Sequence, residues 1–290
     1  MLIGQLFVDG LAMGVVFVIL AAGLVLITSV SRILFMAYGI FYTIGAFTTW
    51  YATVNMNINY FIALIGGVLL TGILAVLCYI TIFQHLQRKK GAFLATLIAS
   101  MGLMMFLGQG TMLVYGTQVQ GIPVVFPGAL HFWDITITVD KVALIIISVF
   151  VTVALSLIYE KTFIGRSLRA VAFLPEAAPL FGINTNIIYM VTLMMGIALA
   201  GFAGGILAPS YGIDPGMGSN IIWTVMLMMM LGGMDSLLGA VVGGILVGQI
   251  LSFGQYYIGS TVQIVIFVII GVVLYFRPQG LLGRGVIIET

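Results

Sequence analysis

The sequence predicts an all-α, polytopic membrane protein with eight or nine transmembrane helices. Hydrophobic residues make up 62% of the 290 residues and charged residues only 6%, whereas about 25% of a soluble domain is charged. The apolar residues form runs that approach the roughly 20 residues a helix needs to cross a bilayer. The 37 glycines fit this class, because small residues let transmembrane helices pack closely. We expect residues 1–290 to form a single transmembrane domain in the lipid bilayer.

Nine apolar segments are candidate spans. In chain order they cover residues 8–29, 35–54, 60–83, 92–114, 142–159, 187–208, 220–233, 237–254 and 260–276. The seventh and eighth segments are short, and the stretch from Gly232 to Gly239 separates them. They form either two steep spans or one broken helix pair, so the pattern predicts eight or nine spans.

The basic residues predict the orientation of the chain. With nine spans, nine of the ten Lys and Arg residues fall on one side of the membrane. Only Lys141 falls on the other side, together with Asp9, Asp134, Asp140 and Asp214. Cytoplasmic loops of membrane proteins carry the excess of Lys and Arg. The N-terminus is therefore expected outside and the C-terminus in the cytoplasm. The positions that mark the two sides are cytoplasmic Arg88, Arg166 and Arg284, and external Trp133 in the long segment 115–141.

Several kinds of chemistry have no residues to carry them. The sequence lacks a Gly-Lys-Ser or Gly-Lys-Thr phosphate-binding loop. No charged residue lies near the middle of a predicted span, where ion-coupled carriers usually place one. Serines and threonines within the predicted spans have no neighbouring His or Lys, which disfavours an intramembrane hydrolase. His85 and His131 are isolated and Cys78 is the single cysteine. We therefore expect no catalytic residue, metal site, cofactor or nucleic-acid partner, and any energy for transport must come from another polypeptide.

The longest polar interruption in the chain covers residues 161–186. Pro175 is expected to open a short helix there, because proline is tolerated at a helix start. Glu176 would then lie in the first turn, where a carboxylate suits the helix dipole, and Gly182 would form a left-handed cap. The stretch is either a solvated loop between two spans or a docking element for a partner protein.

The same stretch carries a family resemblance. The run from Gly165 to Ala172 (GRSLRAVA), followed by Pro175-Glu176-Ala177-Ala178 and Gly182-Ile183, resembles the cytoplasmic loop of branched-chain amino acid ABC transporter permeases. Glu176-Ala177-Ala178 with Gly182 also resembles the opening of the EAA motif, through which importer permeases hold their ATPase subunits. The second half of that motif is missing here.

The C-terminal half extends the resemblance to the full length. The glycine-rich run 231–240 and the closing run 274–284, with its Arg-Pro-Gln-Gly-Leu segment, are similar to the C-terminal signatures of the same family. Two glycine pairs, Gly239 with Gly243 and Gly244 with Gly248, are four residues apart and predict close helix packing.

The resemblance implies one permease subunit of a bacterial inner-membrane ABC importer. It would form half of the pathway for a small amino acid-like solute, of branched-chain amino acid, amide or urea type. The implied partners are a second permease, making a heterodimer, two ATPase subunits that hydrolyse ATP, and a periplasmic substrate-binding protein. The implied coupling residues are Arg166, Arg169, Glu176, Ala177, Ala178 and Gly182. The alternative function is a passive channel for a small neutral solute.

Residues 35–40 differ from the pattern that is typical of this family. Many members carry Asn-Phe-Ala-His-Gly and an acidic residue in the second span, whereas this chain has Phe-Met-Ala-Tyr-Gly-Ile at residues 35–40. We expect the pathway to include Tyr38, Gly39, Tyr42 and Pro215. Tyr38 and Tyr42 share a helix face, and two phenol groups without a fixed charge favour a neutral, amide-like or aromatic solute. The other interpretation of these aromatic residues is helix packing.

Overall fold

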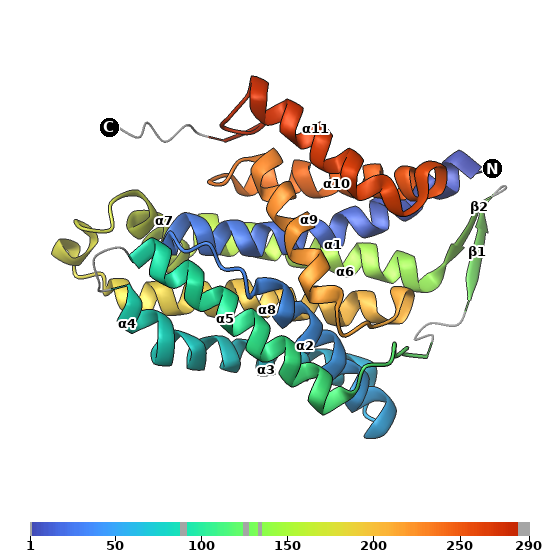
Figure 1. The fold of residues 1–290 in the computed structure, drawn as a ribbon, viewed down its shortest axis with the longest axis horizontal. Coiled ribbons are helices and arrows are strands. Elements are labelled where there is room, and N and C mark those ends of the chain that lie inside the picture. The colour runs from blue at the N-terminus through green and yellow to red at the C-terminus, as the bar shows by residue number, and fades with distance from the viewer. Residues whose placement is uncertain (1, 88–91, 124–127, 133–134, 284–290) are drawn as a thin grey trace.

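The computed structural model describes residues 2–87, 92–123, 128–132 and 135–283, and helices dominate it. Their bounds are α1 Leu2–Ser31, α2 Tyr38–Trp50, α3 Tyr60–Cys78, α4 Gln84–Leu86, α5 Ala92–Tyr115, α6 Val139–Lys161, α7 Phe163–Phe173, α8 Thr185–Tyr211, α9 Met217–Gly232, α10 Leu237–Ile258 and α11 Val262–Phe276. Most long helices lie side by side along the long axis, and α9 crosses them obliquely (Figure 1). Arg88, Trp133 and Arg284, three of the positions that mark sides, lie outside the described residues.

The length and apolar composition of the helices are those of a polytopic membrane protein. Within the described residues, six helices are long and apolar enough to cross a membrane: α1, α3 with its continuation to Leu86, α5, α6, α8 and α10. The helices α9 and α11 are apolar but shorter. The helix α2 continues into a π-helical turn at Tyr51–Asn55. The predicted helical segments therefore exist, while a total of eight or nine spans stays a prediction.

The segment predicted as an external loop contains two strands that the sequence analysis did not predict. β1 (Ala129–Phe132) and β2 (Ile135–Thr138) pair antiparallel. β2 reads Ile-Thr-Ile-Thr, and β-branched residues favour strands. Gln120 and Ile213 also exchange two backbone hydrogen bonds of 2.9 and 2.8 Å. These bonds tie the chain before the hairpin to the loop after α8.

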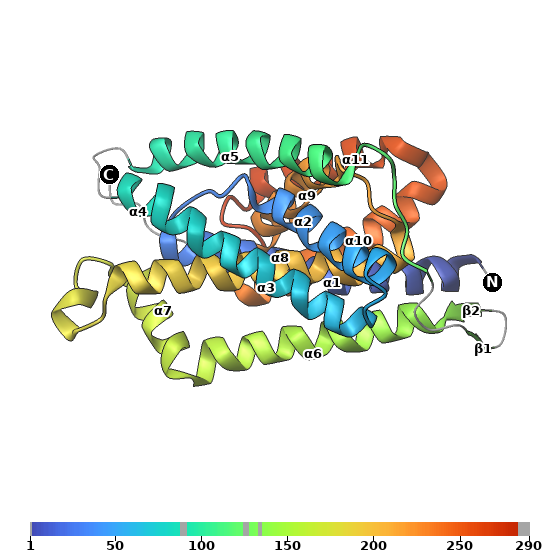
Figure 2. The same cartoon turned by 90° about the horizontal axis from the view of Figure 1, so that it is seen from below.

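The central helix of the fold is α1. Of its most apolar 18-residue window, 89% is buried, compared with 17% in α5 and in α6. Figure 2 shows α5 and α6 on opposite sides of the molecule, with α1 between them. The helix α1 packs against α6, α8, α9 and α10. The exposed surfaces of α5 and α6 are thus suited to lipid, and α1 is suited to a protein interior.

Glycines on α10 allow two close helix contacts. A Cβ atom at Gly243 would lie 2.5 Å from the Met228 carbonyl oxygen of α9, and one at Gly244 would lie 2.6 Å from the Val18 nitrogen of α1. Gly239 faces α9 and Gly248 faces α1 in the same way. The two predicted glycine pairs are therefore packing positions, and each pair serves a different neighbour.

The helix α2 begins inside the bundle and not at its end. Residues 32–37 are not helical and run from the end of α1 back along the bundle to α2 (Figure 1). The Met36 N–H donates to Ser100 Oγ of α5 at 3.2 Å, and the same Oγ lies 3.3 Å from the Leu34 carbonyl oxygen. Non-helical backbone at membrane depth is tolerated where protein groups bind its polar atoms. Ser100 supplies such a group.

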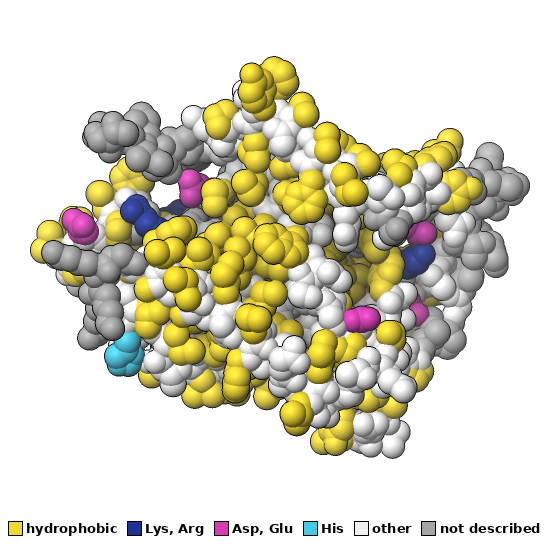
Figure 3. Space-filling view, in the orientation of Figure 1, with side chains coloured by type: hydrophobic (Ala, Val, Ile, Leu, Met, Phe, Trp, Pro, Cys, Tyr) yellow, Lys and Arg dark blue, Asp and Glu magenta, His cyan; other side chains and the backbone are white. Residues whose placement is uncertain are grey.

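Charged side chains gather towards the two ends of the long axis. Figure 3 shows a broad apolar middle on this face, with Lys, Arg, Asp and Glu towards either end. At one of these ends Lys141 of α6 forms a 2.6 Å ion pair with Asp9 of α1. The ion pair agrees with the sequence-based prediction that Lys141 and Asp9 lie on the same side of the membrane.

Candidate functional site

The polar stretch 161–186 forms a folded loop at the end of the molecule opposite the β-hairpin (Figure 2). The helix α7 begins after Thr162, whose hydroxyl oxygen accepts a 3.1 Å hydrogen bond from the Gly165 N–H. Such capping satisfies an amide that has no partner within the helix. Leu168 and Val171 are fully buried and pack with Val30 near the end of α1. The loop is therefore anchored on the bundle by an apolar face.

The two loop arginines differ in their surroundings. The guanidinium of Arg169 is half-buried, donates to the carbonyl oxygens of Tyr159 and Glu160 at the end of α6, and lies 5.3 Å from the Tyr159 ring centroid. Arg166 is exposed and lies 5.9 Å from the Phe163 ring centroid. Arg169 thus fastens α7 to α6, and Arg166 is the arginine whose charge is presented to solvent.

The second half of the loop is less helical than predicted. Residues 175–177 form a turn, and a 3₁₀ helix covers only Ala178–Phe181. Pro179 has no N–H to donate, which limits a regular helix here. Glu176 therefore precedes the helix and does not lie in its first turn, which corrects that prediction. Gly182 ends the helix with φ +77°, the left-handed cap that was predicted.

The tip of this loop exposes large apolar side chains. Phe173, Leu180 and Phe181 have exposed fractions of 82%, 85% and 82%. Glu176 beside them is exposed, Ala177 is half-buried and Ala178 is buried. We call Phe173, Leu180 and Phe181 the apolar tip. The motif residues were predicted from the sequence but these side chains were not, although Leu180 and Phe181 directly precede the predicted cap at Gly182.

The residues predicted to line a pathway lie inside the chain. Tyr38 is fully buried, and its hydroxyl donates to the Leu20 carbonyl oxygen of α1 at 3.0 Å. Tyr42 is 7% exposed, and Pro215 is buried in the loop between α8 and α9. Gly39 lies against the Gly218 carbonyl, where a Cβ atom would overlap. In this conformation the expected surface of two phenol groups is absent at Tyr38 and Tyr42, because both side chains pack between helices. A solute contact at any of the four positions stays a prediction.

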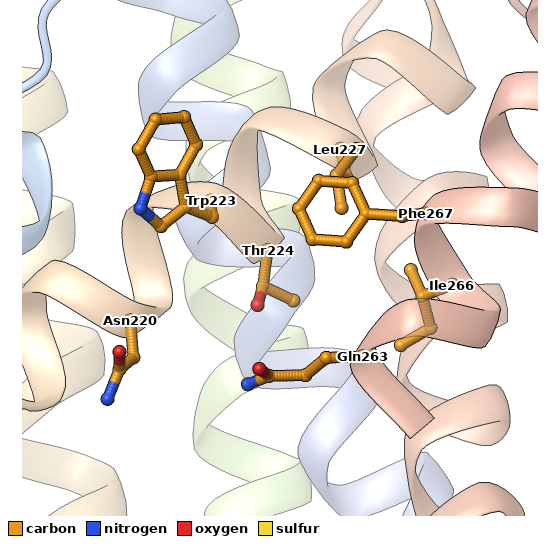
Figure 4. A pocket seen from close by; sticks show the side chains of 7 residues that line it. All are labelled: Asn220, Trp223, Thr224, Leu227, Gln263, Ile266 and Phe267. Carbon is orange, nitrogen blue, oxygen red and sulfur yellow. The ribbon is translucent and has the colours of Figure 1, made fainter. Parts of the chain in front are cut away.

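A cavity of about 360 Å³ opens between α9 and α11 (Figure 4). The helix α9 supplies Asn220, Trp223, Thr224 and Leu227, and α11 supplies Gln263, Ile266 and Phe267. This site was not predicted from the sequence. The signal was present in the spacing of Asn220 and Thr224, two polar residues four apart in an apolar segment. Within the part of the chain that the structure describes, no group of three or more His, Cys, Asp and Glu could hold a metal ion.

Comparison with known proteins identifies the family. Residues 6–276 match the family model described as branched-chain amino acid transport system, permease component. The high-affinity branched-chain amino acid transport system permease protein BraD of Pseudomonas aeruginosa is 28% identical, over 97% of this chain and 95% of its own length. The permease proteins LivH of Salmonella typhimurium and of Escherichia coli K12 are each 26% identical, over 95% of this chain and 94% of their own length. No solved structure matches the chain. Because the family model covers nearly all of the sequence, the chain belongs to the family of permease components of branched-chain amino acid transport systems.

Proposed function

We propose that this permease forms half of the translocation pathway of an ABC importer and that separate ATPase subunits drive it through residues 161–186. The other half of the pathway is a second, different permease chain. A periplasmic binding protein delivers the solute, and ATP is bound and hydrolysed by two partner subunits.

The observation that carries this proposal is the apolar tip. Phe173, Leu180 and Phe181 are more than four-fifths exposed, yet they lie in the polar loop and not along the apolar middle of the bundle. Exposed apolar clusters outside a membrane mark protein contacts. The exposed charges of Arg166 and Glu176 lie in the same loop, and such rim charges orient a partner. An ATPase subunit is the occupant that the family and the EAA-like residues Glu176 to Ala178 favour.

The proposed orientation places this loop in the cytoplasm. Lys161, Arg166 and Arg169 give the loop its positive charge, and basic loops stay inside. The ion pair of Asp9 with Lys141 belongs to the opposite, external side. Nine crossings, with the N-terminus outside and the C-terminus in the cytoplasm, agree with this distribution of charge.

The proposed solute is a branched-chain amino acid. The relatives that align over almost the whole chain are named for such transport. The sequence-based reason for a neutral, amide-like or aromatic solute was an exposed pair of phenols, and Tyr38 and Tyr42 are buried in this structure. The departure at residues 35–40 is then a matter of helix packing.

Reconstitution tests the proposal. The chain is purified from its native membrane, the copurifying chains are identified, and the complex is placed in liposomes with its binding protein. We expect leucine, isoleucine or valine to accumulate only when ATP is supplied on the loop side. Uptake that follows the solute gradient without ATP would instead identify a passive channel.

A further inference from the structure

The cavity between α9 and α11 combines polar and apolar lining. Asn220, Thr224 and Gln263 carry two amides and a hydroxyl, and Figure 4 shows these three groups towards one end of the site. Trp223, Leu227 and Phe267 lie towards the other end. The site has no charged lining residue, so a charged head group would be bound by hydrogen bonds alone. The amide and hydroxyl oxygens can accept from an ammonium group, and the amide N–H and hydroxyl groups can donate to a carboxylate. The two ends of the site therefore match a small molecule with a polar head and an apolar side chain.

The surroundings of the polar groups argue against lipid as the occupant. Asn220 and Gln263 are exposed and Thr224 is half-exposed, on helices that are mostly apolar. A hydrocarbon chain offers no hydrogen-bond partner to an amide or a hydroxyl group, whereas a polar solute does. Among the described residues, no hydrogen bond joins the side chain of Asn220, Thr224 or Gln263 to another protein group, so each can bind a ligand.

The size and the partly open shape of the cavity also fit a solute on its way through. Ligand sites are commonly several hundred Å³, mostly apolar, with a few converging polar groups, and this site has about 360 Å³. Trp223 is 50% exposed and Phe267 48% exposed, so one side of the cavity is open. In a pathway shared by two chains, the second permease would close that side.

We propose that this cavity is a solute-contact site of the translocation pathway, with Asn220, Thr224 and Gln263 binding the polar head of a branched-chain amino acid and Trp223 and Phe267 contacting its side chain. The assignment rests on the proposed import function and states which residues of this chain would contact the solute. Unlike Tyr38 and Tyr42, whose contact with solute stays a prediction, Trp223 and Phe267 are exposed in this conformation.

The transport test uses the reconstituted complex with loaded binding protein. Asn220→Leu, Thr224→Val and Gln263→Leu each remove hydrogen-bonding groups and should lower the rate of leucine uptake by about two- to tenfold, the range expected for one net hydrogen bond. Gln109→Leu is the matched control, because Gln109 is an exposed amide on α5 away from the cavity. Trp223→Ala enlarges the apolar end and should raise uptake of phenylalanine relative to valine.

Three results would overturn the assignment. One is wild-type uptake and selectivity in all cavity variants. Another is an equal loss in Gln109→Leu. The third is loss of the copurifying second permease from the cavity variants, which would make the face a contact between permeases. A wild-type complex that transports no branched-chain amino acid is a separate failure, that of the proposed function.

A labelling experiment tests the site without any solute. In a Cys78→Ser background, a water-soluble maleimide should label Thr224→Cys in the assembled complex. It should leave Phe106→Cys unlabelled, because Phe106 is 76% exposed on the apolar surface of α5. Labelling of position 106 but not of position 224 would show that the cavity is not open to water. That result would overturn the assignment, and it does not depend on whether the reconstituted complex transports solute.

Discussion

The loop 161–186 and the start of α2 were both predicted to be functional, and they differ in which side chains they expose. The loop, which is polar in sequence, exposes Phe173, Leu180 and Phe181. The start of α2 carries the polar hydroxyl of Tyr38 and buries it against the Leu20 carbonyl. The loop therefore offers a surface to a partner, whereas the start of α2 is interior. The contrast predicts that substitutions in the loop affect coupling and that substitutions near Tyr38 affect folding.

The largest effect should come from filling the contact between α2 and α9. A leucine at Gly39 would meet the Gly218 backbone, and packed backbones cannot move apart without losing their other contacts. We expect Gly39→Leu to abolish folded protein in detergent extracts, measured by size-exclusion chromatography. Gly102→Leu on α5, where nothing lies within 4 Å of the added Cβ atom, should elute like the wild type. Equal yields of the two variants would contradict the interior position of Gly39.

The next effect concerns the apolar tip. The double change Leu180→Ser with Phe181→Ser removes two apolar anchors, and such anchors dominate protein interfaces. We expect solute-stimulated ATP hydrolysis by the complex to fall by about tenfold or more, while the thermal midpoint of the permease alone stays the same, because both side chains are exposed. Ile187→Ser at the start of α8, also an exposed apolar residue, is the control. Undiminished stimulation in the double variant would remove the tip from the docking surface.

A smaller effect is expected for the rim charge. Glu176→Lys reverses an exposed carboxylate in the loop, and changes at rim charges mainly alter association rate and salt dependence. We expect weaker binding of the ATPase subunits at low ionic strength and nearly normal binding at high ionic strength, measured by surface plasmon resonance. A defect of the same size at every salt concentration would indicate that Glu176 makes a direct contact instead.

The smallest effect should be that of Tyr38→Phe. This change removes only the hydrogen bond to the Leu20 carbonyl, a loss of about 1 kcal/mol of stability. The thermal midpoint should fall slightly, and the rate of leucine uptake should equal that of the wild type. A clear drop in the rate of leucine uptake without loss of stability would indicate that Tyr38 contacts the solute.

Much of the fold was predictable because it depends on local sequence. The apolar runs located the helices to within a few residues at most ends, and the cap at Gly182 followed from its place after a short apolar run. The helix expected at Pro175 was misplaced because two prolines stand in that stretch. The non-helical residues 32–37 were not predicted, because the group that stabilises them is Ser100, 64 residues beyond Met36 in sequence.

The candidate site was harder to predict than the fold. Whether Tyr38 faces a pathway or the Leu20 carbonyl depends on how α1 and α2 are packed, which no local pattern reveals. The same holds for Asn220 and Gln263, which meet only because α9 and α11 are neighbours. The motif residues Glu176 to Ala178 were found by resemblance, and their role in docking stays a prediction.

The central position of α1 has a consequence for the order in which the protein assembles. This helix is synthesised first, yet the two helices with which it packs most extensively, α8 and α10, lie between residues 185 and 258, and the Lys141 partner of Asp9 follows 132 residues later. Most of the chain must enter the membrane before α1 finds its permanent contacts. During translation α1 therefore resides in lipid or against an insertion factor, with Asp9 still unpaired with Lys141. In a nascent chain that ends before residue 185, α6 would be available to α1, but α8 and α10 would not.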